Sequence, residues 1–410
     1  MLTPHWRAAL LAAALLPGLA AAAPLTLERA LDLAVQHSAT TRAAQAGTLS
    51  ATEAARAAGQ LPDPVLTAGI DNLPITGRDR LSTTADGMTM KRIGVSQEWL
   101  SADKRAAQRA AARAGVDREA AAARIAAAET RLQAALAYVD TFYAAQALAL
   151  ADATEHHSRE EFEAARARLS TATGTGQEAL AMSSARGAAE DEAAEARQVQ
   201  RQAQVQLQRW LGEPADRLES PVFSAMPEEP AFVASHPAVL AAQREADLAR
   251  QEASLTQANR RPNWTWAASY GQRTGYSDMV SVSVSIPIPV APSHRQDRET
   301  AAKLALVDRA EANLAEAQRA ATAEYRSLEA DAERLAERVQ RYQASVIEPS
   351  RQRTAAALAG YRSSQTALMS LFEARHAELL AQRKLLSLQR DLARTRAQLA
   401  FKPVTEGGAP

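Results

Sequence analysis

The sequence predicts a mainly α-helical protein with a small β part, in which long antiparallel coiled-coil helices form an α-barrel and four strands enter a membrane. Alanine-rich, helix-forming sequence dominates the chain, and two stretches interrupt it, at residues 61–100 and 261–292. Both interruptions contain prolines, glycines and residues of alternating polarity, and a long helical segment follows each of them. We therefore expect two β-hairpins, held at the end of a tube of helices.

Each interruption holds two segments in which apolar side chains alternate with small or polar ones, the period-two pattern of a strand. The apolar positions are Leu66, Ala68, Ile70, Ile93, Val95 and Trp99 in the first interruption and Trp264, Trp266, Ala268, Tyr270, Val280, Val282, Val284, Ile286 and Ile288 in the second. Of these, we expect Trp99, Trp264, Trp266 and Tyr270 to lie at the membrane interface, where aromatic side chains are enriched.

The strand pattern is that of a transmembrane barrel, and it implies assembly. Four strands cannot close a barrel, and lipid tolerates no open sheet edge, so several chains must contribute to one barrel. Two chains would supply 8 strands and three would supply 12, and both numbers are even and allowed. Two soluble hairpins packed on the helices are the alternative.

Long rods follow the hairpins. Residues 101–169 contain no proline and a single glycine, and a helix of this length extends on the order of 100 Å. Coiled-coil spacing and abundant alanine predict close helix packing, with an isolated soluble coiled coil as the alternative. The spaced apolar residues are Ile125, Leu132, Leu136, Val139 and Tyr143 in the first rod and Leu328, Leu335, Val339, Tyr342 and Val346 in the second.

Each rod ends in a turn and reverses. The turns lie within residues 167–182 and 359–375, and both carry Gln-x-Ala-Leu on the exit side, at residues 177–180 and 365–368. The returning helices are predicted at about residues 177–211 and 365–400.

The mature chain reads as two tandem copies of helix, hairpin, long helix, turn and helix. The first copy covers residues 24–211, beginning with a helix for which Thr26 is the expected N-cap, and the second covers residues 238–401. A proline-rich connector, residues 212–237, is expected around the waist of the helices, at the equatorial region. Residues 402–410 are expected to form a disordered tail.

The N-terminus, residues 1–23, has the pattern of a secretory signal peptide. Arg7 precedes an apolar run, and small residues with an A-x-A pattern end the segment. A short buried helix is the alternative. No later segment has 18 uninterrupted apolar residues, so we expect no membrane-spanning helix in the mature chain.

Composition excludes several functional classes. The 47 basic and 47 acidic residues balance, so the chain has no electrostatic footprint for nucleic acid. The absence of cysteine excludes thiol catalysis, cysteine-ligated metals and N-terminal cysteine lipidation. There is no nucleophile elbow, zinc-protease motif or P-loop, so we expect neither an enzyme nor a bound cofactor.

Candidate metal ligands are few. His156 and His157 are adjacent, but neighbouring helix residues point about 100° apart, so we interpret them, like His376, as solvated surface. The thioethers of Met88 and Met90 suit Cu(I), although loop or strand side chains are the simpler interpretation. We therefore expect no metal site.

Several strings resemble the TolC-like outer membrane factor family, over essentially residues 25–401. They are LTLERALDLAVQHS, LPDPVLTAG, HPAVLAAQREADLARQEASLTQANRRPNW and GYRSSQTALMSLFEAR. A narrower likeness, carried by LPDPVLTAGIDNLPITG and MTMKRIGVSQEW, is to the outer membrane components of cobalt-zinc-cadmium type heavy-metal efflux systems.

This resemblance implies a homotrimer with a 12-stranded barrel in the cell outer membrane and a helical barrel across the periplasm. The implied partners are outer membrane lipid, a periplasmic adaptor (membrane fusion) protein and an inner-membrane resistance-nodulation-division type pump. The turns would form the periplasmic mouth and meet the adaptor. Glu373 matches an acidic position of the family, whereas Ser370 stands where a second acidic residue is expected. The implied contact residues are Thr173, Gly174, Gly176, Gln177, Gly360, Tyr361, Ser364, Gln365, Leu368, Ser370 and Glu373.

The function that follows is a passive outer membrane duct of a tripartite efflux pump, with divalent heavy-metal cations as the expected cargo. The same duct for drugs or for an exported polypeptide is the first alternative. A periplasmic coiled-coil scaffold without transport is the second.

Overall fold

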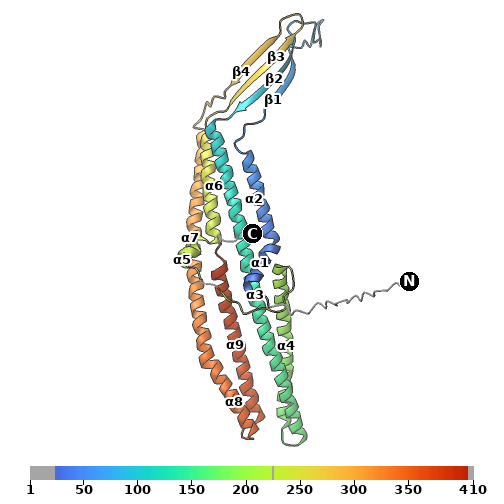
Figure 1. Cartoon of the computed structure of the whole chain (residues 1–410), viewed down its shortest axis with the longest axis vertical. Coiled ribbons are helices and arrows are strands. Elements are labelled where there is room, and N and C mark those ends of the chain that lie inside the picture. The colour runs from blue at the N-terminus through green and yellow to red at the C-terminus, as the bar shows by residue number, and fades with distance from the viewer. Residues whose placement is uncertain (1–23, 224–225, 405–410) are drawn as a thin grey trace, which may run out of the picture.

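A bundle of long helices carries one four-stranded sheet at its end (Figure 1). The computed structural model describes residues 24–223 and 226–404. The predicted signal peptide, and the part of the predicted tail from residue 405 onward, lie outside the described residues. The chain is mostly helical with a few antiparallel strands, so the mainly α class with a small β part is confirmed.

The elements follow the same order twice. In the first half they are α1 (Leu27–His37), α2 (Ala39–Ala57), β1 (Val65–Asp71), β2 (Met90–Trp99), α3 (Ala102–Ser170) and α4 (Gly176–Leu211). In the second half they are α5 (Glu229–Ala234), α6 (Pro237–Asn259), β3 (Trp264–Arg273), β4 (Met279–Ser285), α7 (Gln296–Tyr342), the π-turn η1 (Gln343–Ile347), α8 (Glu348–Arg362) and α9 (Leu368–Phe401). In Figure 1, α3 runs most of the length of the molecule, between α4 and α9 in the lower half.

The first predicted helix is two helices. Thr26 is its N-cap, as expected, and accepts a hydrogen bond from the backbone N–H of Arg29 at 3.3 Å. The helix ends at Ser38, whose hydroxyl caps the next helix by accepting from the N–H of Thr41 at 3.1 Å. A serine that competes with the helical backbone and favours caps explains this break.

The two rods differ in regularity. The first is the single 69-residue helix α3, as predicted. The second is interrupted by the π-turn η1 before α8, so its coiled-coil spacing does not continue unbroken. Pro349, in the first turn of α8, has no N–H to donate to the preceding turn, and the wider π-turn lies at this position.

The main core lies where α1, α3, α4 and the connector meet. Tyr138 of α3 is fully buried there, and its hydroxyl donates to the carbonyl oxygens of Leu25 at 2.6 Å and Glu219 at 2.8 Å. The connector thus pairs with the segment that precedes α1, through a parallel bridge between Leu25 and Leu218. Burial raises the pKa of Tyr138 to about 12, and the charge of Glu219 adds to the rise, whereas the hydrogen bond to the backbone of Glu219 opposes it.

One window of α3 is apolar enough, by length and composition, to cross a membrane. α3 contains no run of 18 uninterrupted apolar residues, so the sequence did not predict this window. Within the chain, 44% of the window is buried.

Candidate functional site

The four strands form one antiparallel sheet in the order β1-β2-β3-β4. Both predicted hairpins are therefore present, and β2 pairs with β3 to join them. The return strand of the second hairpin is shorter than predicted, because it ends at Ser285 and leaves Ile286 and Ile288 outside. Pro287 cannot donate to a ladder, which accounts for the early end. Among the described residues, the outer edges of β1 and β4 have no strand partner.

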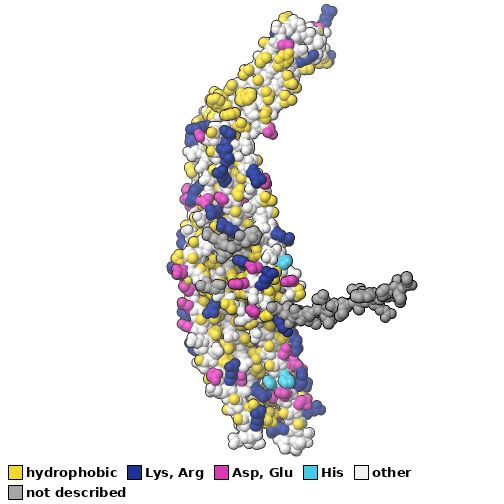
Figure 2. Space-filling model, in the orientation of Figure 1, with side chains coloured by type: hydrophobic (Ala, Val, Ile, Leu, Met, Phe, Trp, Pro, Cys, Tyr) yellow, Lys and Arg dark blue, Asp and Glu magenta, His cyan; other side chains and the backbone are white. Residues whose placement is uncertain are grey.

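The register gives the sheet one apolar and one polar face. One row across the four strands reads Leu66, Val95, Ala268 and Val282. The adjacent row on the opposite face reads Thr67, Gly94, Ser269 and Ser281. The large apolar side chains are exposed to the surroundings of the chain, and yellow side chains gather along this part of the molecule in Figure 2. An apolar face that none of the described residues covers is the mark of an interaction with lipid or a partner.

The predicted aromatic residues all lie on the apolar face. Trp99 pairs with Trp264 at the end of the sheet nearest the helices. Trp266 pairs with Gln97, the next pair on the same face of the sheet. Tyr270 lies opposite Ile93 towards the far end of the strands, and its hydroxyl donates to Asp278. All four side chains are exposed.

A polar cluster joins the sheet to the helices. The ammonium of Lys104, in the first turn of α3, donates to the side chain of Asn263, which in turn donates to Glu98 of β2 at 2.7 Å. Lys104 is buried, and this burial lowers its pKa, although the charge of Glu98 opposes the shift. Neighbouring ends of β2, β3 and α3 are thereby fixed to one another.

At the opposite end, the turns between α3 and α4 and between α8 and α9 have the same backbone. The N–H of Thr173 donates to the carbonyl of Arg168 at 2.9 Å, and the N–H of Gln365 donates to that of Gly360 at 2.8 Å. Each turn contains one residue in the left-handed region, Ala172 at φ 59° and Ser364 at φ 60°. These turns are named tip 1 (residues 171–175) and tip 2 (residues 363–367).

The shared Gln-x-Ala-Leu string does not mark equivalent positions. In the common backbone frame, Ala172 matches Ser364, so Gln177 matches Met369 and lies in the first turn of α4. Gln365 lies in tip 2 itself, before α9 begins. The string is therefore displaced by four residues, one helical turn, between the two copies, and the second returning helix begins at Leu368 rather than Gln365.

Most of the predicted contact residues lie on the surface of the two tips and of the helix ends beside them. Gly174, Gly360 and Tyr361 are half-buried, and a Cβ on Gly360 would lie 2.8 Å from the methyl group of Thr366. Leu368 is buried, so it packs within the chain and is not an accessible contact. The exposed ones are Thr173, Gly176, Gln177, Ser364, Gln365, Ser370 and Glu373.

Helices α3 and α4 form a first helical hairpin, and α8 and α9 form a second. The contacts between these two helical hairpins were not predicted. Arg375 of α9 pairs with Glu161 of α3 at 2.8 Å, and Glu161 is 5% exposed. Further up, Arg383 pairs with Glu192 of α4 at 2.8 Å. These partners are far apart in sequence and resemble the many other charges on the helices, so no local signal could have identified them.

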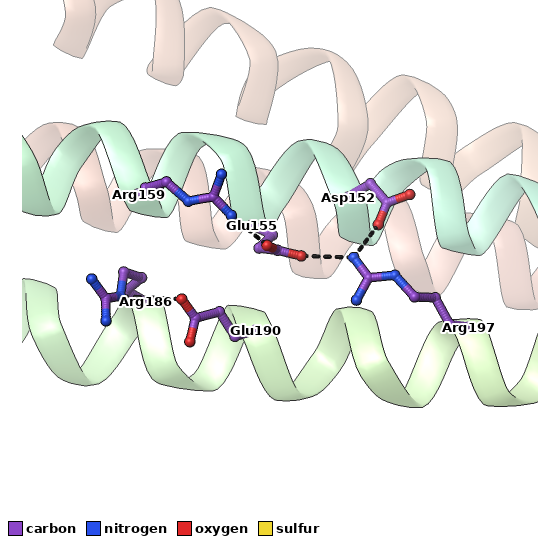
Figure 3. Close-up of polar contacts among 6 residues, drawn as sticks. All are labelled: Asp152, Glu155, Arg159, Arg186, Glu190 and Arg197. Atoms are coloured by element: carbon purple, nitrogen blue, oxygen red, sulfur yellow. Dashed lines mark hydrogen bonds and ion pairs between the residues drawn. The ribbon is translucent and has the colours of Figure 1, made fainter.

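Within the first helical hairpin, charged side chains join α3 to α4 (Figure 3). Arg197 of α4 donates to Asp152 at 2.9 Å and to Glu155 at 2.8 Å, and Arg159 also pairs with Glu155. The hydrogen bond from Arg197 is the main reason why the pKa of Glu155 is lowered. This network faces solvent and aligns the two helices.

Histidines and methionines do not converge. His156 and His157 each approach one oxygen of Glu160 at 3.3 Å, and His376 stacks on Phe372. Met90 begins β2 and Met88 is exposed in the preceding loop. In residues 24–223 and 226–404, no group of three or more His, Cys, Asp or Glu side chains is arranged to hold a metal.

No family model and no curated protein matches this chain. Solved structures do match. The outer membrane protein VceC of Vibrio cholerae is 18% identical, with a TM-score of 0.76 over 92% of this chain and 96% of its own. The CmeC outer membrane channel of Campylobacter jejuni is 11% identical, with a TM-score of 0.78 over 94% and 87%. CusC is 15% identical, with a TM-score of 0.76 over 92% and 91%. The chain therefore has the fold of these outer membrane channels.

Proposed function

We propose that this protein is the outer membrane channel of a tripartite efflux pump, a passive duct built from three copies. The observation that carries the proposal is the sheet at the end of a long helical bundle, which has one apolar face and, within residues 24–223 and 226–404, two edges without a strand partner. Lipid would cover the apolar face, and Trp99, Trp264, Trp266 and Tyr270 would lie near its interfaces. The polar face, rich in serine and threonine, would line the water-filled interior.

Assembly follows from the edges. The β4 edge of one copy would pair with the β1 edge of the next, and three copies give the 12 strands that the sequence resemblance implies. The helices would then form an α-barrel across the periplasm. Tips 1 and 2 would surround its mouth and meet an adaptor protein and an inner-membrane pump. The solved channels support this arrangement through their common fold.

A disulfide test exploits the absence of cysteine in the chain. Thr67 of β1 and Ser283 of β4 are on the polar face and would be neighbours across a fully overlapped β4–β1 junction. Within one chain β1 and β4 are about 14 Å apart, three strand spacings, too far for a disulfide. The double variant Thr67→Cys/Ser283→Cys should therefore form a covalent trimer that reduction converts to monomer.

Each single-cysteine variant is the matched control and should stay monomeric on the same non-reducing gel. Extraction of the wild-type protein should require detergent. Recovery of the double variant as an uncross-linked, soluble monomer would exclude the channel and favour the scaffold alternative.

We propose that the cargo is divalent heavy-metal cations, because the sequence of the first β-hairpin resembles that of heavy-metal efflux components. Loss of the protein from its host should lower tolerance to zinc, cobalt, cadmium or copper, measured as growth over a metal series. If metal tolerance were unchanged and drug sensitivity rose, the cargo would be organic solutes, and the channel itself would stand.

A further inference from the structure

A buried histidine, His236, connects residues 402–404, which follow α9, to the start of α6. His236 is 7% exposed and is the N-cap residue of α6. Directly beside it, the N–H of Val404 donates to the carbonyl oxygen of Ser235 at 2.8 Å, and Val404 is itself buried. Residues 402–404, here named the C-terminal strap, therefore lie against the junction between α5 and α6.

The hydrogen bonds of His236 define its protonation state. Its Nδ1 accepts from the backbone N–H of Ala238 at 3.3 Å, so the single proton of the neutral ring lies on Nε2. Nε2 then donates to Oε2 of Glu324 on α7 at 3.2 Å. The other oxygen of Glu324 accepts from the ammonium of Lys402 in the strap. One carboxylate thus connects α6, α7 and the strap.

Three features of this geometry oppose a second proton on the ring. A proton on Nδ1 would face the N–H of Ala238, which would lose its acceptor. A cation at a helix N-terminus is unfavourable, because that end carries partial positive charge. The imidazolium would also have to share Glu324 with Lys402. In agreement, burial first and the charge of Lys402 second lower the pKa of His236, although Glu324 opposes them.

Other charged groups around the ring are already paired. From α7, the hydroxyl of Tyr325 donates to Glu329 at 3.0 Å, and Arg326 pairs with Glu229 of α5 at 3.0 Å. Burial raises the pKa of Glu324, but Lys402 and His236 lower it overall, so Glu324 stays ionised above pH 5.5. Of the groups named here, only His236 has an ordinary pKa between 5.5 and 7.5, so it is the group that takes up a proton when the cluster opens in this range.

We propose that His236 is an acid-sensitive latch, which holds the C-terminal strap and the start of α6 together near neutral pH and releases both when Nδ1 is protonated. The pKa of the folded state lies below the unfolded value of about 6.5. The contribution to stability is therefore complete above that value and is lost as the pH falls below it. The latch is a property of the single chain and does not rest on the proposed channel.

Hydrogen exchange of the full-length protein at pH 7.5, 6.5 and 5.5, corrected for the intrinsic exchange rate, tests the latch. Exchange of peptides covering residues 235–240 and 399–404 should rise by less than about twofold from pH 7.5 to 6.5 and by up to about fivefold from 6.5 to 5.5, because one proton is taken up on opening by a group whose open-state pKa is about 6.5. Equal protection at all three values would overturn the proposal.

The variant His236→Asn separates titration from structure. Asparagine is a good N-cap, so its side-chain oxygen can still accept from Ala238 while nothing titrates. Both segments should then exchange independently of pH. His376→Asn, at an exposed histidine of α9, is the matched control and should keep the wild-type response.

A second variant, Glu324→Gln, covers the case in which His236→Asn is poorly folded. The glutamine can accept from Nε2 but no longer stabilises an imidazolium, so the pKa of the closed state falls further while that of the open state is unchanged. The rise in exchange from pH 6.5 to 5.5 should therefore be at least as large as in the wild type. A wild-type pH response in His236→Asn, or a smaller rise in Glu324→Gln, would show that another group controls these segments.

Discussion

Tip 1 and tip 2 have the same backbone turn, but the helix that leaves each tip is stabilised differently. At tip 1, the hydroxyl of Thr175 accepts from the N–H of Glu178 at 3.2 Å, which is half of a capping box. At tip 2 the equivalent residue is Ala367, which offers no side-chain cap. There, α9 is held instead by Leu368 and Leu371, which pack against Met182 of α4 and Ala165 of α3.

The difference shows how two copies of one motif take different roles in one chain. Tip 1 supplies its own local stability and leaves Leu180 of α4 exposed by 74%. Tip 2 depends on contacts with α3 and α4 of the first helical hairpin, where Leu368 is 2% exposed. In the proposed channel, tip 1 would present an apolar side chain to a partner, whereas tip 2 would be positioned by tip 1.

The largest effect should come from removing the packing at tip 2. Leu368→Ala deletes a buried side chain and should destabilise the region by about 3 kcal/mol, or roughly a hundredfold in local opening. Leu180→Ala removes an exposed side chain and should change stability by less than about 0.5 kcal/mol. Hydrogen exchange of residues 355–380 and 165–190 measures both, and similar effects of the two variants would contradict the comparison.

The ion pair between the hairpins should give the next largest effect. Glu161→Gln leaves Arg375 without its partner in a mostly buried site, and we expect a loss of about 2 kcal/mol. The matched control is Asp152→Asn, in the exposed network of Figure 3, which should cost no more than about 0.5 kcal/mol. A double-mutant cycle with Arg375→Met isolates the pair, and a coupling energy near zero would refute its role.

Local patterns in the sequence predicted the strands well and the tips poorly. Period-two alternation identified β1 to β4, because a sheet with one apolar face repeats every two residues. The left-handed residues of the tips are Ala172 and Ser364. Neither residue type favours this conformation as glycine does, so it could not be predicted from residue type. Identity of a four-residue string then misaligned the copies by one helical turn, whereas Thr175 and Glu178, a capping-box pattern, mark the start of α4.

Long-range partners were beyond local patterns for a physical reason. The pairing of Arg375 with Glu161 depends on how two hairpins are placed side by side, and each residue alone looks like an ordinary exposed helix charge. The same holds for His236 and Lys402, whose shared partner Glu324 lies on a third element. Such contacts follow from packing, which the sequence of one helix does not contain.

A transplanted cap should make the second tip resemble the first. Thr175→Ala should destabilise the start of α4 by about 1 kcal/mol, since the N–H of Glu178 loses its acceptor. The converse change, Ala367→Thr with Ser370→Glu, installs the capping box of tip 1 at tip 2 and should stabilise the start of α9 by up to about 1 kcal/mol. Protection of the first turn of each helix against hydrogen exchange measures the two changes, which should have opposite signs.

The smallest effect tests whether the two turns are truly the same. Ala172→Gly and Ser364→Gly each relieve a left-handed residue of its Cβ and should stabilise the folded state by about 0.5 kcal/mol after the entropy of the more flexible unfolded chain is subtracted. Because φ at the two positions differs by one degree, the two gains should be equal within error, in contrast to every other pair of substitutions above. Unequal gains in matched unfolding experiments would mean that packing around tip 2 also constrains its backbone, so that the tips differ in the turn as well as in the helices that leave it.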